Sequence, residues 1–278
     1  MPERADGLAR ALVRGTAFRP DGRARYSSLV TSDLGVRCDE GPRLSFDREA
    51  LRARAAGLHE RYVAATPYPY AVIDGFLGAP GARLVAERFP APDHPGWMRR
   101  DYDEQSARLG QLQRTGFAGV DSIVRQLLAE LSGMAFLDFL SELTGVDGLI
   151  ADPHFRGAGL TATLRGGHLA VHADFNRDRT RHLDRALTVL YYAAPEWDES
   201  WGGELELFSR DGKTREVSIA PLPDRLCVMA HGDDHFHGHP TPLACPADRF
   251  RAVVSAYYYV ARASDADREA HGAIWARR

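Results

Sequence analysis

The feature that most constrains the fold is a succession of short β-forming runs that begins after Asp152-Pro153. Each run is rich in branched and aromatic residues and ends at turn residues, which is typical of strands. Between two of the runs, Asp211-Gly212 is a strong hairpin signal. We predict strands over residues 160–165, 169–175, 186–194, 204–208, 216–219, 225–230 and 252–260. Many short strands at this spacing predict a sandwich, a barrel or a jelly roll.

The residues before this region favour helices. Leu51 and later apolar residues recur at helical spacing behind Asp47, which is a good capping residue. We predict helices over residues 47–62, 80–89 and 122–144, a short strand over 70–73 and a loop over 90–119. Gly133 is expected to break the third helix and Gly145 to end it. Residues 1–44 have no steady periodicity and predict an irregular arm.

The composition is typical of a soluble globular protein. A chain of 278 residues can bury a sizeable core, and we favour a single folded domain. A hydrophobic content of 44%, a charged content of 26% and a net charge of -3 exclude a disordered or strongly basic chain. We therefore expect no nucleic-acid partner, because binding through phosphates needs a basic surface.

The cysteines and the N-terminus indicate the compartment. Cys38, Cys227 and Cys245 are odd in number and widely spaced, which argues against a disulfide scaffold and for a reducing environment. The first residues lack an apolar signal core, and no run approaches the length that spans a membrane. We therefore expect a cytoplasmic protein without a membrane partner, whereas the oligomeric state stays open.

A histidine and a carboxylate lie two residues apart in one predicted strand. Residues i and i+2 of a strand point to the same face, so His172 and Asp174 can reach one metal ion together. A third ligand from elsewhere would complete a site of two histidines and one carboxylate, the arrangement of non-haem iron(II) oxygenases. The pair alone is a weak motif, and its support comes from the order of strands, turns and histidines that follows it.

The third ligand has several candidates. They share one downstream loop and are His231, His235, His237 and His239. Spacing alone does not choose among them. His168 is on the same strand face as the first pair but four residues before His172, so we assign it to the pocket lining or to solvent contact rather than to the ligands. We assign no role to His154.

Residues 68–261 resemble the iron(II)/2-oxoglutarate-dependent dioxygenases, and within them the prolyl 4-hydroxylase-like branch. The likeness is densest in Gly-Gly-His-Leu-Ala-Val-His-Ala-Asp-Phe-Asn at 166–176, Trp-Gly-Gly-Glu-Leu at 201–205, His-Gly-His-Pro at 237–240 and residues 249–259. The resemblance implies an α+β, mainly β fold, with a double-stranded β-helix (jelly roll) core braced by N-terminal helices. We accordingly divide the chain into an N-terminal arm and helix over 1–66 and a dioxygenase domain over 67–278. That domain has helical support over 67–150 and the β-helix core over 151–262.

The resemblance also implies roles for single residues. His172, Asp174 and His237 match the metal ligands that carry catalysis, with His235 as the next candidate for the third ligand. Arg251 matches the base that holds the far carboxylate of 2-oxoglutarate, and Arg249 is the fallback for that role. An arginine suits this task because its planar fork pairs with a carboxylate through two hydrogen bonds.

The chain departs from the branch at three places. Gly157-Ala158-Gly159-Leu160-Thr161 stands where the branch often has Gly-Gly-Gly-Leu-His, and Tyr191-Tyr192-Ala193 where it often has Tyr-Leu-Asn. The paired arginines before the last strand are reduced to Arg251-Ala252. None of these changes affects the metal triad, but the first two fall on strands that line the pocket in relatives. They therefore bear on the substrate.

The resemblance implies an enzyme that hydroxylates an unactivated C–H bond of a peptide residue, an amino acid or a small natural product. Its cofactors would be Fe(II), 2-oxoglutarate and O2, with ascorbate as an optional addition, and its products include succinate and CO2. The carboxylate of Asp174 favours hydroxylation over the halogenation that related enzymes with Gly or Ala at this position carry out. The alternatives are a non-catalytic metal- or ligand-binding β-helix protein, or desaturation or cyclisation at the same site.

Other residues were expected near the pocket mouth. They are Trp197, Trp201, Arg177, Arg179 and Arg181, which flank the predicted metal-binding strands. The arginines could receive an anionic or peptide substrate, or could belong to a solvated loop. Gly202-Gly203 is expected to serve tight strand packing rather than catalysis.

Overall fold

The computed structural model describes residues 42–110, 112–261 and 269–276. The predicted N-terminal arm lies almost entirely outside the described residues, and Cys38 lies outside them. Cys227 and Cys245 are both buried, and neither forms a disulfide.

Five helices brace the described part of the chain. They are α1 (Arg48–Ala56), α2 (His59–Val63), α3 (Gly78–Arg88), α4 (Ser122–Leu131) and α5 (Met134–Thr144). The Asp47 carboxylate accepts a hydrogen bond of 2.9 Å from the Ala50 amide, so it caps α1 as predicted. Gly133 separates α4 from α5, and Gly145 ends α5 in the left-handed conformation with φ of 71°. Because α1 packs on α5, the two helices belong to one compact unit, and the division predicted at residue 66 stays a prediction.

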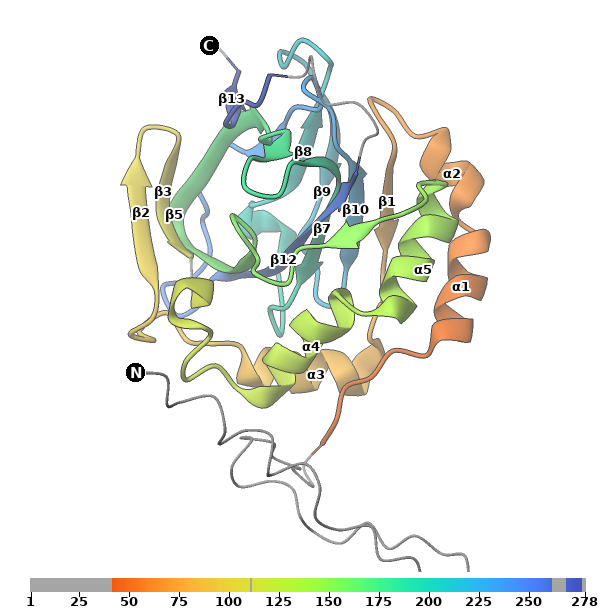
Figure 1. The fold of residues 1–278 in the computed structure, drawn as a ribbon. Coiled ribbons are helices and arrows are strands. Elements are labelled where there is room, and N and C mark those ends of the chain that lie inside the picture. Colours follow the sequence, from red (N-terminus) through yellow and green to blue (C-terminus); the bar gives the residue numbers. More distant parts are fainter. Residues whose placement is uncertain (1–41, 111, 262–268, 277–278) are drawn as a thin grey trace, which may run out of the picture. The chain divides into compact units, whose positions relative to one another are not determined.

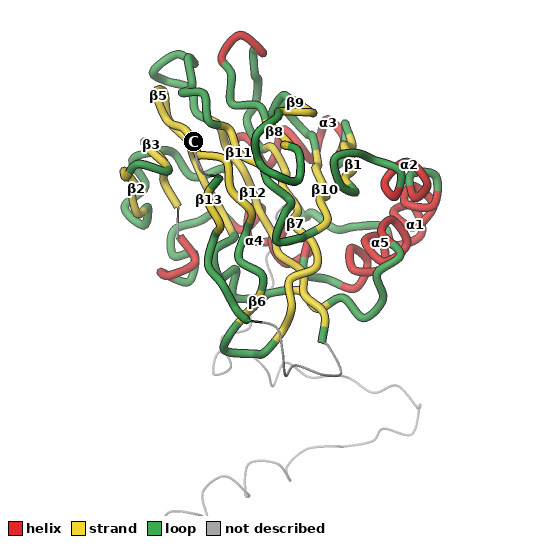
Figure 2. The backbone as a smooth tube through the Cα atoms, turned by 90° about the horizontal axis from the view of Figure 1, so that it is seen from above, coloured by secondary structure: helices red, strands yellow, loops and turns green. Residues whose placement is uncertain are grey.

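The described strands form one curled sheet in which each pair of neighbouring strands is antiparallel (Figures 1 and 2). Its main path runs β1-β10-β7-β12-β5-β11-β8-β9. The strands of this path are β1 (Tyr70–Ile73), β5 (Gly159–Ala173), β7 (Leu183–Tyr192), β8 (Leu205–Phe208), β9 (Arg215–Ile219), β10 (Leu226–Ala230), β11 (His237–His239) and β12 (Arg251–Val260). Outside it are β2 (Met98–Tyr102), β3 (Gln105–Gly110), β4 (Ile150–Ala151), β6 (Arg177–Asp178) and β13 (Ile274–Trp275). Two 3₁₀ helices, η1 (Leu112–Thr115) and η2 (Glu199–Trp201), complete the fold.

Two hydrophobic clusters cover opposite faces of the central strands. On β10, Leu226 and Val228 pack into the larger cluster against the helices, whereas Cys227 and Met229 pack into a smaller cluster inside the curl. Tyr191 and Tyr192 of β7 divide in the same way. This alternation follows from the two-residue period of a strand. It explains why these strands are continuous apolar runs in the sequence.

The structure corrects three sequence predictions. Residues 90–119 are not a loop throughout, because β2 and β3 form a hairpin there that pairs with β5. The hairpin escaped prediction because its strands are mostly polar and lack an apolar alternation. The predicted strands at 160–165 and 169–175 are one strand, β5, and the histidine-rich loop contains the short strand β11.

None of the helices in the described segments is long and apolar enough to cross a membrane.

Candidate active site

A cavity of about 270 Å³ lies inside the curled sheet. Its walls come from β3, β5, β7, β8, β11 and β12, with residues of β2 and β13 at its edge. Figure 1 shows the helices gathered on one side of the sheet and the β2–β3 hairpin at the other edge. The helices therefore support the cavity from outside and contribute no side chain to its lining.

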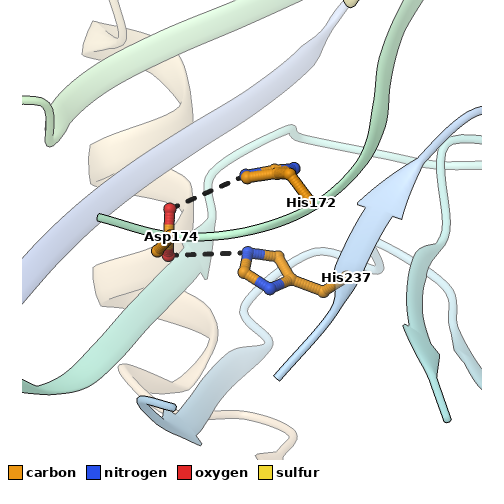
Figure 3. Close-up of side chains that lie close together, drawn as sticks. All are labelled: His172, Asp174 and His237. Atoms are coloured by element: carbon orange, nitrogen blue, oxygen red, sulfur yellow. Dashed lines mark ion pairs between the residues drawn. The ribbon is translucent and has the colours of Figure 1, made fainter. Parts of the chain in front are cut away.

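His172, Asp174 and His237 meet in this cavity (Figure 3). His172 is near the end of β5 and lies directly opposite His237, the first residue of β11. The Nε2 atoms of His172 and His237 lie 3.6 Å from Oδ1 and Oδ2 of Asp174, respectively. One ligand atom from each residue lies within 4.8 Å of the others, so the three side chains can hold one metal ion.

Backbone carbonyls orient both imidazole rings. His172 Nδ1 lies 2.9 Å from the carbonyl oxygen of Ala170, and His237 Nδ1 lies 3.1 Å from that of His235. Because a carbonyl only accepts, each Nδ1 must donate, and each Nε2 of the neutral ring keeps its lone pair toward the third residue. Burial lowers the pKa of His237 to about 4, which keeps this ring neutral near pH 7.

Arg185 holds the carboxylate of Asp174. Its Nη2 donates to Asp174 Oδ2 at 2.7 Å and to Thr188 Oγ1 at 2.9 Å, and the arginine side chain is fully buried. The guanidinium lies over the ring of Tyr257, 3.3 Å from its centroid, and 4.7 Å from that of Phe175. Burial acts to raise the pKa of Asp174, but the charge of Arg185 opposes this effect, and the pKa lies well below the usual value. Asp174 is therefore an ionised, oriented oxygen donor.

The other histidines of the downstream loop lie elsewhere. His235 is buried, stacks on Tyr68 at 4.2 Å between ring centroids, and donates from Nδ1 to the carbonyl oxygen of Ala230 at 2.7 Å. Among the residues that the structure describes, His172, Asp174 and His237 are the one group with metal-ligand spacing. The geometry thus brings His237, rather than His235, to the first two residues.

The remaining histidine assignments have mixed outcomes. His239 lines the cavity, and no partner is found in the described structure for either of its buried ring nitrogens. His168 bonds Ser106 Oγ at 2.8 Å, is half-buried and does not line the cavity, so of its two predicted places the structure supports solvent contact. The side chain of His231 is buried beside Asp233, with His231 Nε2 3.8 Å from Oδ1, and His154 is exposed.

Arg251 is buried and lines the same cavity as the three candidate ligands. Its Nε donates to the carbonyl oxygen of Gly203 at 2.7 Å, and its Nη2 to the hydroxyl of Tyr192 at 3.2 Å. Arg249 instead pairs at 2.7 Å with Glu196 and with Asp248 on the surface. The structure therefore offers Arg251, and not the fallback Arg249, to a ligand in the cavity.

Gly203 makes the close approach of Arg251 possible. Its φ is 79°, and a Cβ at this position would lie 3.2 Å from Cδ of Arg251. The Trp-Gly-Gly segment therefore serves tight packing, as expected, and also sets the position of a cavity-lining cation. Trp197 donates from Nε1 to the Gly202 carbonyl oxygen at 3.0 Å, and its ring packs edge-on against Trp201.

The residues expected at the pocket mouth do not line the cavity. Arg181 pairs with Asp152 and Asp178, and Arg179 donates to the Ala270 carbonyl oxygen. The cavity edge is instead formed by the hairpin and by Trp275, whose ring lies 5.0 Å from that of His172 between centroids. Sequence reasoning missed Arg185, the hairpin arginines and Trp275, because they match no local motif and reach the site only through strand pairing.

Residues 158–259, which contain all three candidate ligands and Arg251, match the family model of the 2OG-Fe(II) oxygenase superfamily. The segment that carries the candidate ligands therefore belongs to the 2OG-Fe(II) oxygenase superfamily. The predicted family, and with it the need for Fe(II) and 2-oxoglutarate, is confirmed. The alternative of a non-catalytic binding protein is therefore not supported. None of the curated proteins matches the chain.

The oxygenase is similar in fold to solved prolyl hydroxylases. One from Trichoplax adhaerens, solved with a peptide fragment of hypoxia inducible factor, has 16% identity and a TM-score of 0.53, over 76% of this chain and 92% of that one. A prolyl-4-hydroxylase from Pseudomonas putida has 17% identity and a TM-score of 0.53, over 75% and 100%. Prolyl 4-hydroxylases from Phytophthora capsici have 18% identity and a TM-score of 0.51, over 82% and 70%. At these identities the likeness shows the fold alone, and it confirms the predicted double-stranded β-helix.

The donor set fits the iron(II) that the family requires. Two neutral imidazole nitrogens and one carboxylate suit a first-row divalent ion and leave coordination positions for other ligands. The site also has hydrogen bonds that fix each ligand, since the two Nδ1 atoms and Asp174 Oδ2 all have partners.

We expect His172→Ala and His237→Ala each to abolish iron binding and turnover, because each removes a buried nitrogen donor. The wild-type oxygenase should contain about one iron per chain when purified without chelator, measured as metal content. The control is His235→Ala, which should keep its iron because the ring bonds a carbonyl outside the triad. If His237→Ala retains iron and His235→Ala loses it, the third ligand is His235.

Arg185→Lys should weaken iron binding by about 10–100-fold, the usual effect of losing a partner that orients a metal ligand. Lysine keeps the charge but loses the planar fork that bonds Asp174 and Thr188 together. The matched control is Arg181→Lys, which alters an ion pair with Asp152 and Asp178 on a nearby loop. Titration of the metal-free proteins with iron(II) measures the difference, and equal affinities in the two variants would mean that Arg185 does not position the ligand.

Proposed function

We propose that this oxygenase hydroxylates an unactivated C–H bond, with His172, Asp174 and His237 as iron ligands and Arg251 as the base for 2-oxoglutarate. One observation carries the proposal: the three donors and a buried arginine with spare donor capacity line the same enclosed cavity. Among the described residues, two oxygens accept hydrogen bonds from the five N–H groups of Arg251, so the guanidinium has donors left to bind a carboxylate.

When bound, iron(II) and 2-oxoglutarate supply the oxygen chemistry: one atom of O2 enters the keto acid, which becomes succinate and CO2, and the other enters the C–H bond. The protein supplies binding and orientation. Arg251 holds the far carboxylate through charge-assisted hydrogen bonds, which are stronger in a buried pocket than in water. Arg185 keeps Asp174 ionised and in place. Apolar walls, such as Leu169, Leu190 and Val253, limit the entry of water.

The substrate proposed is a residue in a peptide, with a free amino acid or a small natural product as the other candidates. The similar prolyl hydroxylase from Trichoplax adhaerens was solved with a peptide fragment, which supports the first choice. Thr161 and Tyr192 stand at the positions where this chain departs from the branch; Thr161 lines the cavity, and Tyr192 contacts Arg251. A substrate other than peptidyl proline is compatible with those departures. The cytoplasmic location and the absence of nucleic-acid and membrane partners stay predictions.

Arg251→Ala should raise the apparent 2-oxoglutarate requirement by at least about tenfold, since it removes a charge-assisted pair worth roughly 1.4 kcal/mol or more. The measurement is the rate of succinate formation against 2-oxoglutarate concentration. Arg249→Ala is the matched control, because Arg249 pairs with surface carboxylates outside the cavity.

A steric version of this test uses the two glycines before β8. Gly203→Ala pushes against Arg251, whereas Gly202→Ala strains the backbone at a similar φ with no atom closer than 3.8 Å. Only the first change should raise the 2-oxoglutarate requirement. A normal requirement in Arg251→Ala would assign the co-substrate carboxylate to another cation.

Succinate formation without any added substrate tests the proposed chemistry most directly. Enzymes of this type often oxidise the bound keto acid slowly on their own, so the wild-type oxygenase should form succinate with iron(II), ascorbate and 2-oxoglutarate. Asp174→Ala should lose this activity, because its site lacks the carboxylate donor. Asp174→Gly should lose it as well, and product analysis in the presence of chloride tests whether the opened position admits halide. No succinate above the Asp174→Ala background from iron-loaded wild type, even with pools of peptides and amino acids, would refute the proposed function.

A further inference from the structure

Three arginines and a threonine form one row across four strands on the cavity side of the sheet. Arg100 of β2 lies directly opposite Arg108 of β3, Arg108 opposite Thr163 of β5, and Thr163 opposite Arg251 of β12. Directly opposed residues in antiparallel strands share a face, and all three arginines line the cavity. The row therefore presents three cations to one enclosed space.

A local distortion turns Arg108 toward the cavity. The register of β3 against β5 shifts between Ser106 and Arg108, and the intervening residue Ala107 has a φ of 47°. A non-glycine residue in this region costs free energy, and such irregularities often re-aim a side chain near an active site. Like charges directly opposite each other, as in Arg100 and Arg108, destabilise a sheet as well. Both costs fall on the β2–β3 hairpin, at Arg108 or at the residue next to it.

The cations of this row have no carboxylate counter-charges in the described part of the chain. Among the residues that the structure describes, no carboxylate lies within ion-pair distance of Arg100, Arg108 or Arg251, and Asp174 is the only acidic side chain of the cavity lining. Arg108 donates from Nη1 to Oε1 of the buried Gln105 at 2.9 Å, which fixes the guanidinium. Its Nε is buried without a partner in the described structure, as is Oγ1 of Thr163.

The neighbouring arginine of the hairpin shows the contrast. Arg99 is next to Arg100 in β2 and is therefore on the other face, where it pairs with Asp101 at the exposed surface. Burial, together with the nearby charge of Arg251, lowers the pKa of Arg108 to about 10, which leaves it charged near neutral pH. On the outer face of the hairpin Asp101 neutralises Arg99, whereas on the cavity face no described carboxylate pairs with Arg100 or Arg108.

In the proposed complex with iron(II) and 2-oxoglutarate, the positive charges of Arg100 and Arg108 are not balanced by negative charges. Iron(II) and Arg251 together carry three positive charges, and Asp174 with the two carboxylates of 2-oxoglutarate carries three negative ones. Arg100 and Arg108 are then uncompensated, and the buried Arg185 behind Asp174 adds to the surplus. An anion at the hairpin would offset the repulsion and satisfy the unpartnered Nε.

We propose that Arg100 and Arg108 bind an oxyanion of the substrate, a carboxylate or a phosphate, and so make this oxygenase selective for acidic substrates. This inference rests on the proposed function in one respect, the assignment of Arg251 to 2-oxoglutarate. Arg108 is the specificity-determining residue, because Gln105 holds it in place and its Nε has no other partner in the described structure.

Calorimetry on the protein loaded with iron(II) and 2-oxoglutarate, in the absence of oxygen, tests the proposal without turnover. The probes are doubly blocked Gly-Xaa-Gly peptides in matched pairs, with Xaa as Glu or Gln, Asp or Asn, and phosphoserine or serine, together with inorganic phosphate. At least one acidic member should bind the wild type about tenfold or more tightly than its neutral partner. The pair that shows the preference separates carboxylate from phosphate.

Arg108→Gln should abolish that preference and leave the affinity for 2-oxoglutarate within about twofold of wild type. Arg108→Lys should retain part of the preference, because it keeps the charge. The matched control is Arg99→Gln, on the outer face of the same hairpin, which should leave the preference unchanged. If no acidic probe binds the wild type more tightly than its neutral partner, the proposal is wrong.

A second outcome would overturn it in favour of another role. If Arg108→Gln weakens 2-oxoglutarate binding about tenfold and leaves the probe preference intact, Arg108 is a second clamp for the co-substrate. Failure of the proposed function would look different. It would appear as absent succinate formation in the wild type, a reaction that needs no acidic substrate.

Discussion

The pairing of one edge of β5 with β12 and then with β11 is the interaction on which the site depends. The first part of β5 pairs with β12, which carries Arg251, and its last residues pair with β11, which carries His237. The change of partner occurs around Gly166 and Gly167. Gly166 has a φ of 76°, and a Cβ on Gly167 would lie 2.6 Å from Cγ2 of Thr163 and 2.8 Å from the Ser106 carbonyl oxygen. A side chain does not fit there, so glycine allows one strand to connect the metal end of the cavity to its arginine end.

The charges of the cavity extend the same arrangement. Asp174 follows the end of β5 and is held by Arg185, whose guanidinium packs on the rings of Tyr257 and Phe175. A buried carboxylate without this partner would tend to take up a proton, and a protonated carboxyl is a poor metal ligand. The pairing thus places the ligands, and Arg185 keeps the carboxylate in the charge state that metal binding requires. The row of arginines at the other end is suited to anions for a complementary reason, because its cations have no carboxylate partners in the described structure.

Much of the fold follows from local sequence. The alternation in Leu226–Ala230 and the cap at Asp47 are nearest-neighbour effects, and His172 with Asp174 follows from the period of a strand. The choice of His237 over His235 does not, because it depends on which residue of β11 faces His172 across the sheet. Arg185 was not predictable for the same reason. Its contact with Asp174 joins residues of two strands whose register no short motif encodes.

The hairpin was missed for a different physical reason, and that reason bears on its role. A strand with one face in solvent and the other on a polar cavity lacks the apolar alternation from which strands are predicted. Arg100 and Arg108 were therefore predicted to lie in a loop. Ala107 in a left-handed conformation and two opposed arginines also violate the local rules that make strands predictable. Such violations persist where the surrounding structure or a bound ligand compensates them, and they concentrate at functional sites. The β2–β3 hairpin, which local sequence did not predict, is therefore also the segment whose uncompensated positive charges face the cavity of the candidate metal site.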